Sequence, residues 1–175
     1  MIDLPTAKEV TAIAPDVRAI IAKRSRNKGS NYERDVAKKI AAYFGQTWTQ
    51  CFYRTKPHGH AQPEGDIKPI NEMYARWKQY ASLGPIECKS RAEWSWNNFF
   101  KNPEKSYLLQ YWRKSNEDTG MDNTVLIFTK PSMMDFVMHA DDMLSLSGAF
   151  ISFEVEEDLL IIQTLDAFLK NYWPL

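Results

Sequence analysis

The 175-residue chain is poor in the residues that build disulfide scaffolds and zinc sites, since it has two cysteines and three histidines. We expect Cys51 and Cys88 to be buried free thiols, and together with His58 and His60 they match no structural zinc spacing. The chain also lacks an apolar run near the ~20 residues that span a bilayer, and its first residues do not resemble a signal peptide. These absences predict a cytoplasmic protein without a membrane segment.

Charge is unevenly distributed along the chain, although the net charge is zero. From residue 18 to residue 56 there are ten Lys and Arg against two acidic residues, whereas from residue 135 to the end there are eight acidic residues against one lysine. A basic segment would attract a phosphate backbone, but two solvated faces of opposite sign would give the same counts. The length suits one domain, 1–175, with a basic N-terminal arm (1–27) and an acidic C-terminal extension of the sheet (131–175).

The clearest helix is predicted over 30–44, where apolar residues recur at spacings of three and four before Gly45. Ser30 and Glu33 have the spacing of a capping box, which gives Glu33 a structural explanation. Glu33 also continues the apolar stripe, so its carboxylate would point inward. The preceding residues 23–29 are expected to form an exposed basic linker, which is either a phosphate contact or a solvated hinge.

The rest of the chain alternates between strand-like and helix-like patterns, which predicts an α/β fold with a central mixed β-sheet flanked by helices. A helix that begins at Asn102-Pro103 is expected to bury Tyr107, Leu108, Tyr111 and Trp112. Residues 133–143 have no clear assignment. The expected strands are 47–55, 66–70, 85–90, 123–129, 149–155 and 158–164, and the other expected helices are 71–83 and 165–172.

The Glu-Cys-Lys segment would hold two charged side chains side by side on a strand. Successive side chains of a strand point to opposite faces, so Glu87 and Lys89 would share one face. Burying such charges is costly unless they have a partner or a function. A carboxylate there can hold a divalent cation, and an ammonium can orient water or stabilise a developing anion. Asp66, at the start of another strand, would add a second carboxylate.

At these residues the chain resembles the PD-(D/E)XK nuclease superfamily and, more closely, the archaeal and phage Holliday junction resolvases within it. The resemblance covers roughly residues 26–130. It departs where Gly65 replaces the proline before the aspartate, where a helix-like insertion lies at 71–83, and in the acidic C-terminal part. The matching motifs are Lys28-Gly29-Ser30-Asn31-Tyr32-Glu33-Arg34, Arg54 before a loop, Gly65-Asp66-Ile67, and Ile86-Glu87-Cys88-Lys89.

The resemblance implies a restriction-endonuclease-like core and Mg²⁺-dependent hydrolysis of phosphodiester bonds in branched DNA by a homodimer, with Mn²⁺ able to substitute. It also suggests a phage protein that acts in a host cell. Asp66 and Glu87 would bind the cation, with Glu33 and the backbone carbonyl of Cys88, and Lys89 would position the attacking water. DNA contacts are expected from Arg24, Arg26, Lys28, Arg34, Arg54, Lys56 and His58.

Two alternatives to a resolvase fit the same sequence. One is a nuclease of the superfamily that acts on linear DNA, as an exonuclease or a restriction-type enzyme. The other is a non-catalytic DNA-binding module with a relict site. Digestion of linear ends would favour the first, and DNA binding without cleavage would favour the second.

Overall fold

The computed structural model describes residues 15–55, 65–79, 84–140, 148–155 and 158–172. The strands are β1 (Phe52–Arg54), β2 (Ile67–Pro69), β3 (Ile86–Ser90), β4 (Val125–Thr129), β5 (Phe136–Ala140), β6 (Phe150–Val155) and β7 (Asp158–Thr164). The helices are α1 (Pro15–Tyr43), α2 (Trp48–Cys51), α3 (Asn71–Gln79), α4 (Trp96–Lys101), the 3₁₀ helix η2 (Pro103–Lys105), α5 (Tyr107–Thr119) and α6 (Leu165–Tyr172). In these ranges no helix combines the length and the apolar character needed to cross a membrane.

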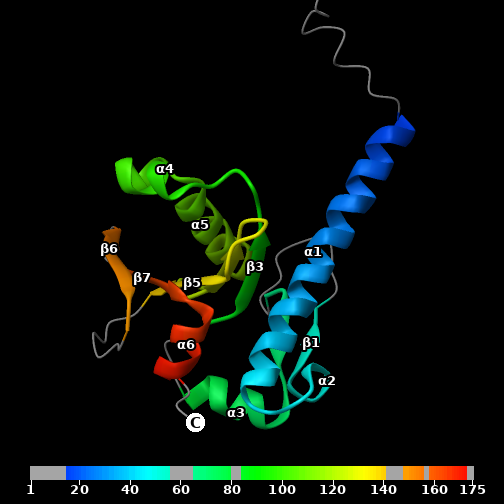
Figure 1. Cartoon of the computed structure of the whole chain (residues 1–175), viewed down its shortest axis with the longest axis vertical. Helices are drawn as coiled ribbons and strands as arrows, with labels where there is room; N and C mark the ends of the chain where they lie inside the picture. The colour runs from blue at the N-terminus through cyan, green and yellow to red at the C-terminus, as the bar shows by residue number, and fades with distance from the viewer. Residues whose placement is uncertain (1–14, 56–64, 80–83, 141–147, 156–157, 173–175) are drawn as a thin grey trace, which may run out of the picture.

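The strands form one mixed sheet in the order β1-β2-β3-β4-β5-β7-β6 (Figure 1). The central strands β3 and β4 are parallel, and the other neighbouring strands are antiparallel. Helices flank this sheet, so the structure confirms the α/β fold with a central mixed sheet. The strands β5, β7 and β6, from the acidic part of the chain, continue the sheet beyond β4.

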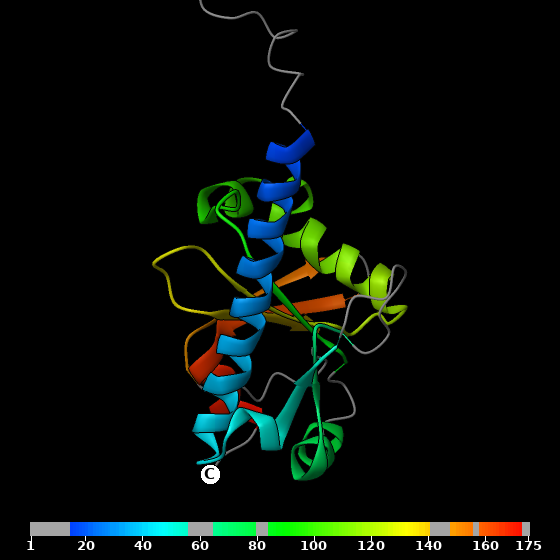
Figure 2. The same ribbon diagram turned by 90° about the vertical axis from the view of Figure 1, so that its right-hand side faces the viewer.

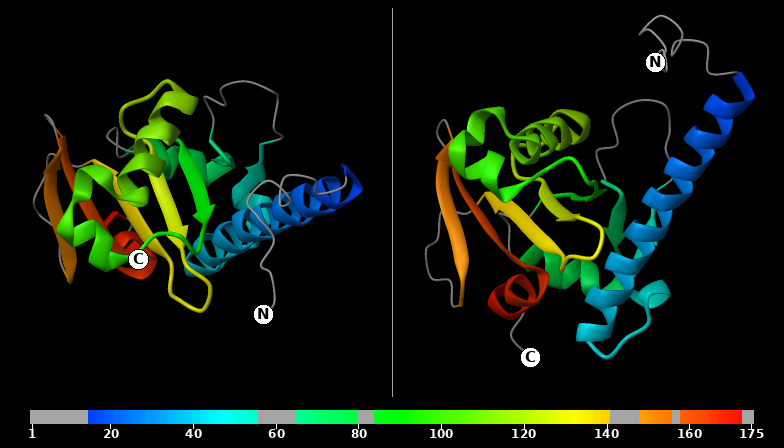
Figure 3. Two further views of the ribbon diagram at one scale, coloured as in Figure 1. Left: turned by 90° about the horizontal axis from the view of Figure 1, so that it is seen from above. Right: turned by 45° about the horizontal axis from the view of Figure 1, so that its top comes forward.

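Two hydrophobic cores lie on opposite faces of the sheet. Helices α1 and α6 pack on one face, and α4 and α5 pack on the other (Figures 1 and 3). The side chains of β4 alternate between them, since Val125 and Ile127 belong to the first core and Leu126 and Phe128 to the second. All five residues of β4 are buried. The adjacent strand β3, which carries the Glu-Cys-Lys segment, is therefore supported by a strand that is packed on both sides.

Helix α1 is longer than the sequence pattern predicts, because it begins at Pro15 and continues to Tyr43. The predicted linker at 23–29 is wrong, since these residues are helical, and Ser30 lies inside the helix rather than at its N-cap. Residues with good helix propensity upstream of Ser30 override the capping signal. The N-terminal half of α1 extends beyond the sheet (Figure 2). It presents the exposed side chains of Arg24, Arg26 and Lys28.

The predicted strand at 47–55 is shortened to β1, because a short helix forms first. Gln50 Oε1 accepts a hydrogen bond from the backbone N–H of Thr47 at 3.2 Å, and this cap begins α2. The local capping interaction therefore overrides the strand propensity of the β-branched and aromatic residues. Within this segment, only Phe52, Tyr53 and Arg54 pair with β2.

The helix predicted from Asn102-Pro103 is divided into η2 and α5. Ser106 caps α5, because its Oγ accepts a hydrogen bond from the backbone N–H of Leu109 at 3.2 Å. Leu108 and Trp112 are buried as predicted and Tyr111 is half-buried, but Tyr107, the first residue of α5, is 48% exposed instead of buried. The unassigned segment 133–143 contains β5.

Candidate active site

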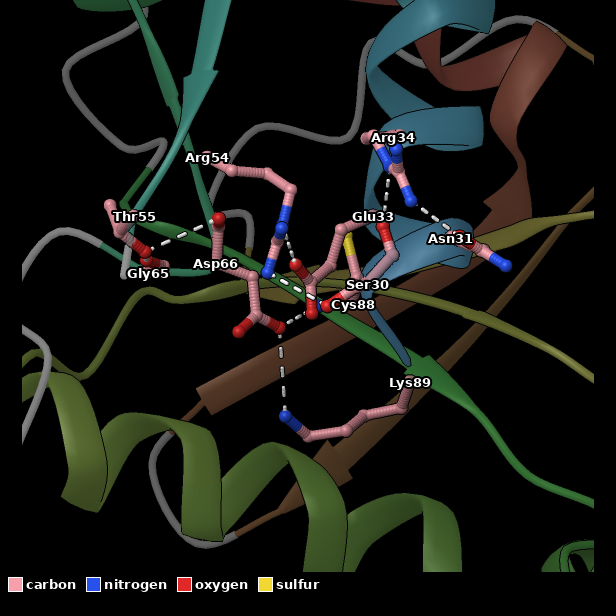
Figure 4. A network of polar contacts seen from close by, with 10 residues as sticks. All are labelled: Ser30, Asn31, Glu33, Arg34, Arg54, Thr55, Gly65, Asp66, Cys88 and Lys89. Carbon is pink, nitrogen blue, oxygen red and sulfur yellow. Dashed lines mark hydrogen bonds and ion pairs between the residues drawn. The ribbon is translucent and has the colours of Figure 1, made fainter. Parts of the chain in front are cut away.

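Asp66 is held against β3 by backbone contacts on both sides. Gly65 has a φ of +72°, and a Cβ there would lie 2.8 Å from Ile86 N and closer still to the Ile86 carbonyl oxygen. Only glycine fits this close approach. The Asp66 N–H donates to the Ile86 carbonyl at 2.8 Å, and the backbone N–H of Cys88 donates to Asp66 Oδ2 at 2.8 Å (Figure 4). The carboxylate of Asp66 is therefore fixed by the main chain of the neighbouring strand.

Lys89 connects the two carboxylates of this site. Its Nζ donates to Glu87 Oε2 at 2.8 Å and lies 3.8 Å from Asp66 Oδ2. Glu87 and Lys89 pair in register with Leu126 and Phe128, so both lie on the sheet face that α4 and α5 cover. Glu87 is only 5% exposed. The strand thus presents an acid and a base together, as the alternation of side chains predicts.

Burial and close charges shift the pKa values of both residues. Burial and then the Asp66 carboxylate raise the pKa of Glu87 to about 7, against the opposing effect of Lys89. Burial alone would lower the pKa of Lys89, but Asp66 and Glu87 outweigh it and raise that pKa above its ordinary value. At neutral pH the ammonium therefore remains charged, whereas Glu87 titrates close to neutrality.

Glu33 reaches the site from α1 and is paired with Arg54. The Arg54 guanidinium donates through Nε to Glu33 Oε2 and through Nη2 to Ser30 Oγ, the latter at 2.9 Å (Figure 4). Burial and then Asp66 raise the pKa of Glu33, while Arg54 and Lys89 oppose this shift. The inward orientation predicted for Glu33 is therefore observed, and its partner is a residue that the sequence suggested only as a DNA contact.

A pocket of about 520 Å³ opens between α1 and the end of β3. Its lining includes Arg26, Lys28 and Glu33 from α1, then Asp66, and residues 88–93. The acidic side chains of Glu33, Asp66 and Glu93 and the basic groups on the α1 wall are thus brought together from distant parts of the sequence. A polyanion could enter along the basic wall and reach the carboxylates.

A family model described as "Phage putative PDDEXK endonuclease" matches residues 24–171. The chain belongs to this family. The match confirms the resemblance to the PD-(D/E)XK superfamily and extends it beyond residue 130, through the acidic C-terminal part, to α6. No curated protein and no solved structure matches the chain. The protein is therefore a nuclease, and the family model spans nearly the whole of the described fold.

The predicted DNA contacts of this nuclease fall into four groups. Arg26 and Lys28 line the pocket, and Arg24 lines an adjoining one of about 450 Å³ that also includes Lys28. Arg34 is exposed and donates to the Ser30 carbonyl and to Asn31 Oδ1 of its own helix, so it is not brought into the pocket. Arg54 is engaged with Glu33. Lys56 and His58 lie outside the described residues.

Several polar residues of the candidate site were not identified from the sequence. Ser30 orients Arg54, and the backbone N–H of Thr55 donates to the Asp66 carbonyl at 3.1 Å. Arg91 and Glu93 line the pocket beyond the end of β3. The i, i+3 spacing of Ser30 and Glu33 on a continuous helix would have placed the serine beside Glu33, but the capping interpretation obscured it.

The donor atoms of these side chains suit a hard divalent cation. Their carboxylates are, however, paired with basic side chains. Carboxylate and carbonyl oxygens are the donors that Mg²⁺ prefers, and Asp66 acts electrostatically on both Glu33 and Glu87. Within the described ranges, however, no three Asp, Glu, His or Cys side chains form a group that could hold a metal ion together. A bound cation would have to compete with Lys89 for Glu87 and with Arg54 for Glu33.

Proposed function

We propose that this nuclease uses Mg²⁺ to hydrolyse phosphodiester bonds in DNA and that its substrate is branched DNA such as a four-way junction. The observation that carries the chemistry is the placement of Lys89, which contacts Glu87 and lies beside an Asp66 carboxylate fixed by the backbone of β3. An acid pair with one charged ammonium between them suits the transfer of a phosphoryl group to water.

Asp66 and Glu87 would hold the cation, with the backbone carbonyl of Cys88, and Glu33 would complete the set directly or through water. When bound, the cation would polarise the phosphate and make a bound water a better nucleophile, and Mn²⁺ would serve in place of Mg²⁺. Lys89 would donate hydrogen bonds to the attacking water and to the phosphate oxygens. Its raised pKa supports this role, because it keeps the positive charge where negative charge develops.

The preference for branched DNA is supported by the four motifs that resemble resolvases and by the basic half of α1. This half projects beyond the sheet beside the pocket (Figure 2), so it could follow a second arm of a junction. We further propose that residues 1–175 act as one domain and that two copies form a homodimer in the cytoplasm of a host cell. A two-fold dimer would match the symmetry of a four-way junction.

Cleavage of a labelled four-way junction beside a linear duplex of matched sequence tests this proposal. The assay uses wild type, Lys89→Ala and Lys170→Ala, each with Mg²⁺ and with EDTA. Lys170 is an exposed lysine on α6, away from the pocket, and serves as the matched control. We expect paired, Mg²⁺-dependent cuts in the junction that Lys170→Ala retains and that Lys89→Ala lowers by at least about 100-fold.

Other outcomes of the same assay separate the alternatives. Equal cleavage of the linear duplex would support the proposed hydrolysis but contradict the preference for branched DNA. Binding without cleavage in any divalent metal would contradict the enzymatic proposal and leave a DNA-binding module. Full cleavage activity in Lys89→Ala would show that Lys89 is not required and would contradict the proposed mechanism.

A further inference from the structure

Two tyrosines on α5 form an exposed aromatic surface beside the candidate active site. Tyr107 and Tyr111 are one helical turn apart, and their rings stack with a centroid distance of 6.2 Å and an interplanar angle of 22°. Tyr107 is 48% exposed and Tyr111 is half-buried, whereas the neighbouring Trp112 is buried in the core. Tyr111 packs against the second core, so the aromatic face that stays open to solvent is that of Tyr107, supported by the stacked Tyr111 ring.

The position of α5 places this pair next to Lys89. Lys89 lies on the sheet face that α5 covers, because it pairs in register with Phe128 of the same core. The ribbon of α5 passes beside the ammonium end of Lys89 in the close view (Figure 4). The opposite flank of α5 carries Arg113 and Asn116, which line a separate pocket. The tyrosines therefore occupy the flank of α5 that faces away from that pocket.

The charged residues that act on Tyr111 also place it beside the candidate active site. Burial and Glu93 raise the pKa of Tyr111, while Arg91 and Lys89 act to lower it. All three of these charged residues line the candidate active site. A phenol with an ordinary pKa is already uncharged at neutral pH, and the upward shift at Tyr111 acts in the same direction, so the ring does not repel a phosphate backbone.

We propose that the Tyr107–Tyr111 pair is a stacking platform for an unpaired nucleobase next to the phosphate that is cleaved. This inference rests on the proposed DNA substrate and deepens it. Bases stack readily on aromatic side chains, whatever their sequence. Only an unpaired base can expose its ring face to a protein, because both faces are covered inside a duplex. With α1 contacting phosphates and the tyrosines contacting a base, the site would favour DNA that offers an unpaired base, as a bulge does or as a branch point does where a base pair opens.

A binding experiment in EDTA separates this platform from cleavage. The probes are a duplex with one unpaired 2-aminopurine and the same duplex with that base paired. We compare wild type with Tyr107→Ala, Tyr107→Phe and the control Phe150→Ala, in which the lost ring is 37% exposed on the edge strand β6. Tyr107→Ala should weaken binding of the unpaired probe about tenfold and leave the paired duplex unchanged. Tyr107→Phe and Phe150→Ala should bind as wild type does.

Fluorescence of the 2-aminopurine gives a direct reading of stacking. Wild type and Tyr107→Phe should quench it, and Tyr107→Ala should restore it. Equal loss of affinity for both duplexes, or quenching that survives in Tyr107→Ala, would overturn the platform even if the protein cleaves junctions. Tyrosine-dependent quenching in a protein that cleaves no DNA would support the platform and overturn the proposed enzymatic function instead.

Discussion

The Tyr32 hydroxyl donates a hydrogen bond at 3.2 Å to Oδ1 of Asp135, a residue 103 positions later in the sequence. Lys39, about two helical turns after Tyr32 on α1, donates to the other carboxylate oxygen. The Asp135 side chain is only 5% exposed and directly precedes β5. One carboxylate therefore attaches the middle of α1 to the sheet, immediately next to Glu33.

Tyr32→Phe should lower the free energy of unfolding by about 1 kcal/mol, because it removes one donor from a buried carboxylate without leaving a cavity. Urea denaturation measures this change. Tyr107→Phe is the control, since it removes the hydroxyl of a side chain that is half exposed and should leave stability unchanged. Equal stability of wild type and Tyr32→Phe would indicate that Lys39 alone satisfies Asp135.

Glu87 should make stability depend on pH in the absence of metal. Its pKa is 4.5 ordinarily and about 7 in the folded protein, so the folded state holds the proton more tightly. Its stabilising contribution is therefore complete below the unfolded pKa and is lost as the pH rises through 7. The loss should be on the order of 2–3 kcal/mol, measured by urea denaturation in EDTA between pH 4.5 and 8.

The matched variant for this measurement is Glu87→Gln, which keeps the shape of the side chain and cannot titrate. Its stability should vary less with pH than that of wild type, by the amount assigned to Glu87. Identical pH profiles for the two proteins would show that Glu87 does not have a raised pKa. Glu33, whose pKa is also raised, contributes equally to both proteins and cancels in the comparison.

The sequence predicts those parts of the site that depend on local geometry. Alternation along a strand is enough to place Glu87 and Lys89 on one face, and they do lie together. Asp66 was predicted at the start of another strand as a second carboxylate, and it does lie against β3, although the close approach at Gly65 was not predicted. In each case the relevant partners are a few residues apart or on paired strands.

Contacts that depend on how α1 lies across the sheet could not be predicted from the sequence. The pairing of Arg54 with Glu33 and of Tyr32 with Asp135 requires the position of the helix relative to strands far along the chain. No local sequence pattern determines where α1 lies on the sheet. Tyr107 was misplaced for a different reason, since it is the first residue of α5 and lies beside the stripe that buries Leu108 and Trp112 rather than within it.

Gly65→Ala should destabilise the protein by at least about 3 kcal/mol, because the new Cβ adds a clash with Ile86 to an unfavourable positive φ. Gly120→Ala is the matched control, since Gly120 has a similar φ of +67° and no atom within 4 Å of the added Cβ. That variant should lose only about 1 kcal/mol. Equal losses in urea denaturation would mean that strain alone, and not the approach to β3, accounts for Gly65.

Arg26→Ala and Lys28→Ala should each weaken DNA binding and make it less dependent on salt. The slope of log affinity against log salt concentration is negative, and each lost phosphate contact reduces its magnitude by about 0.9. Fluorescence anisotropy over a series of salt concentrations measures the slope, with Lys170→Ala as a control that leaves it unchanged. Arg34→Ala decides the path of the DNA, because Arg34 is on the same helix but outside the pocket. An equal change of slope in Arg34→Ala would contradict a path confined to the pocket and would require DNA to contact the outer face of α1.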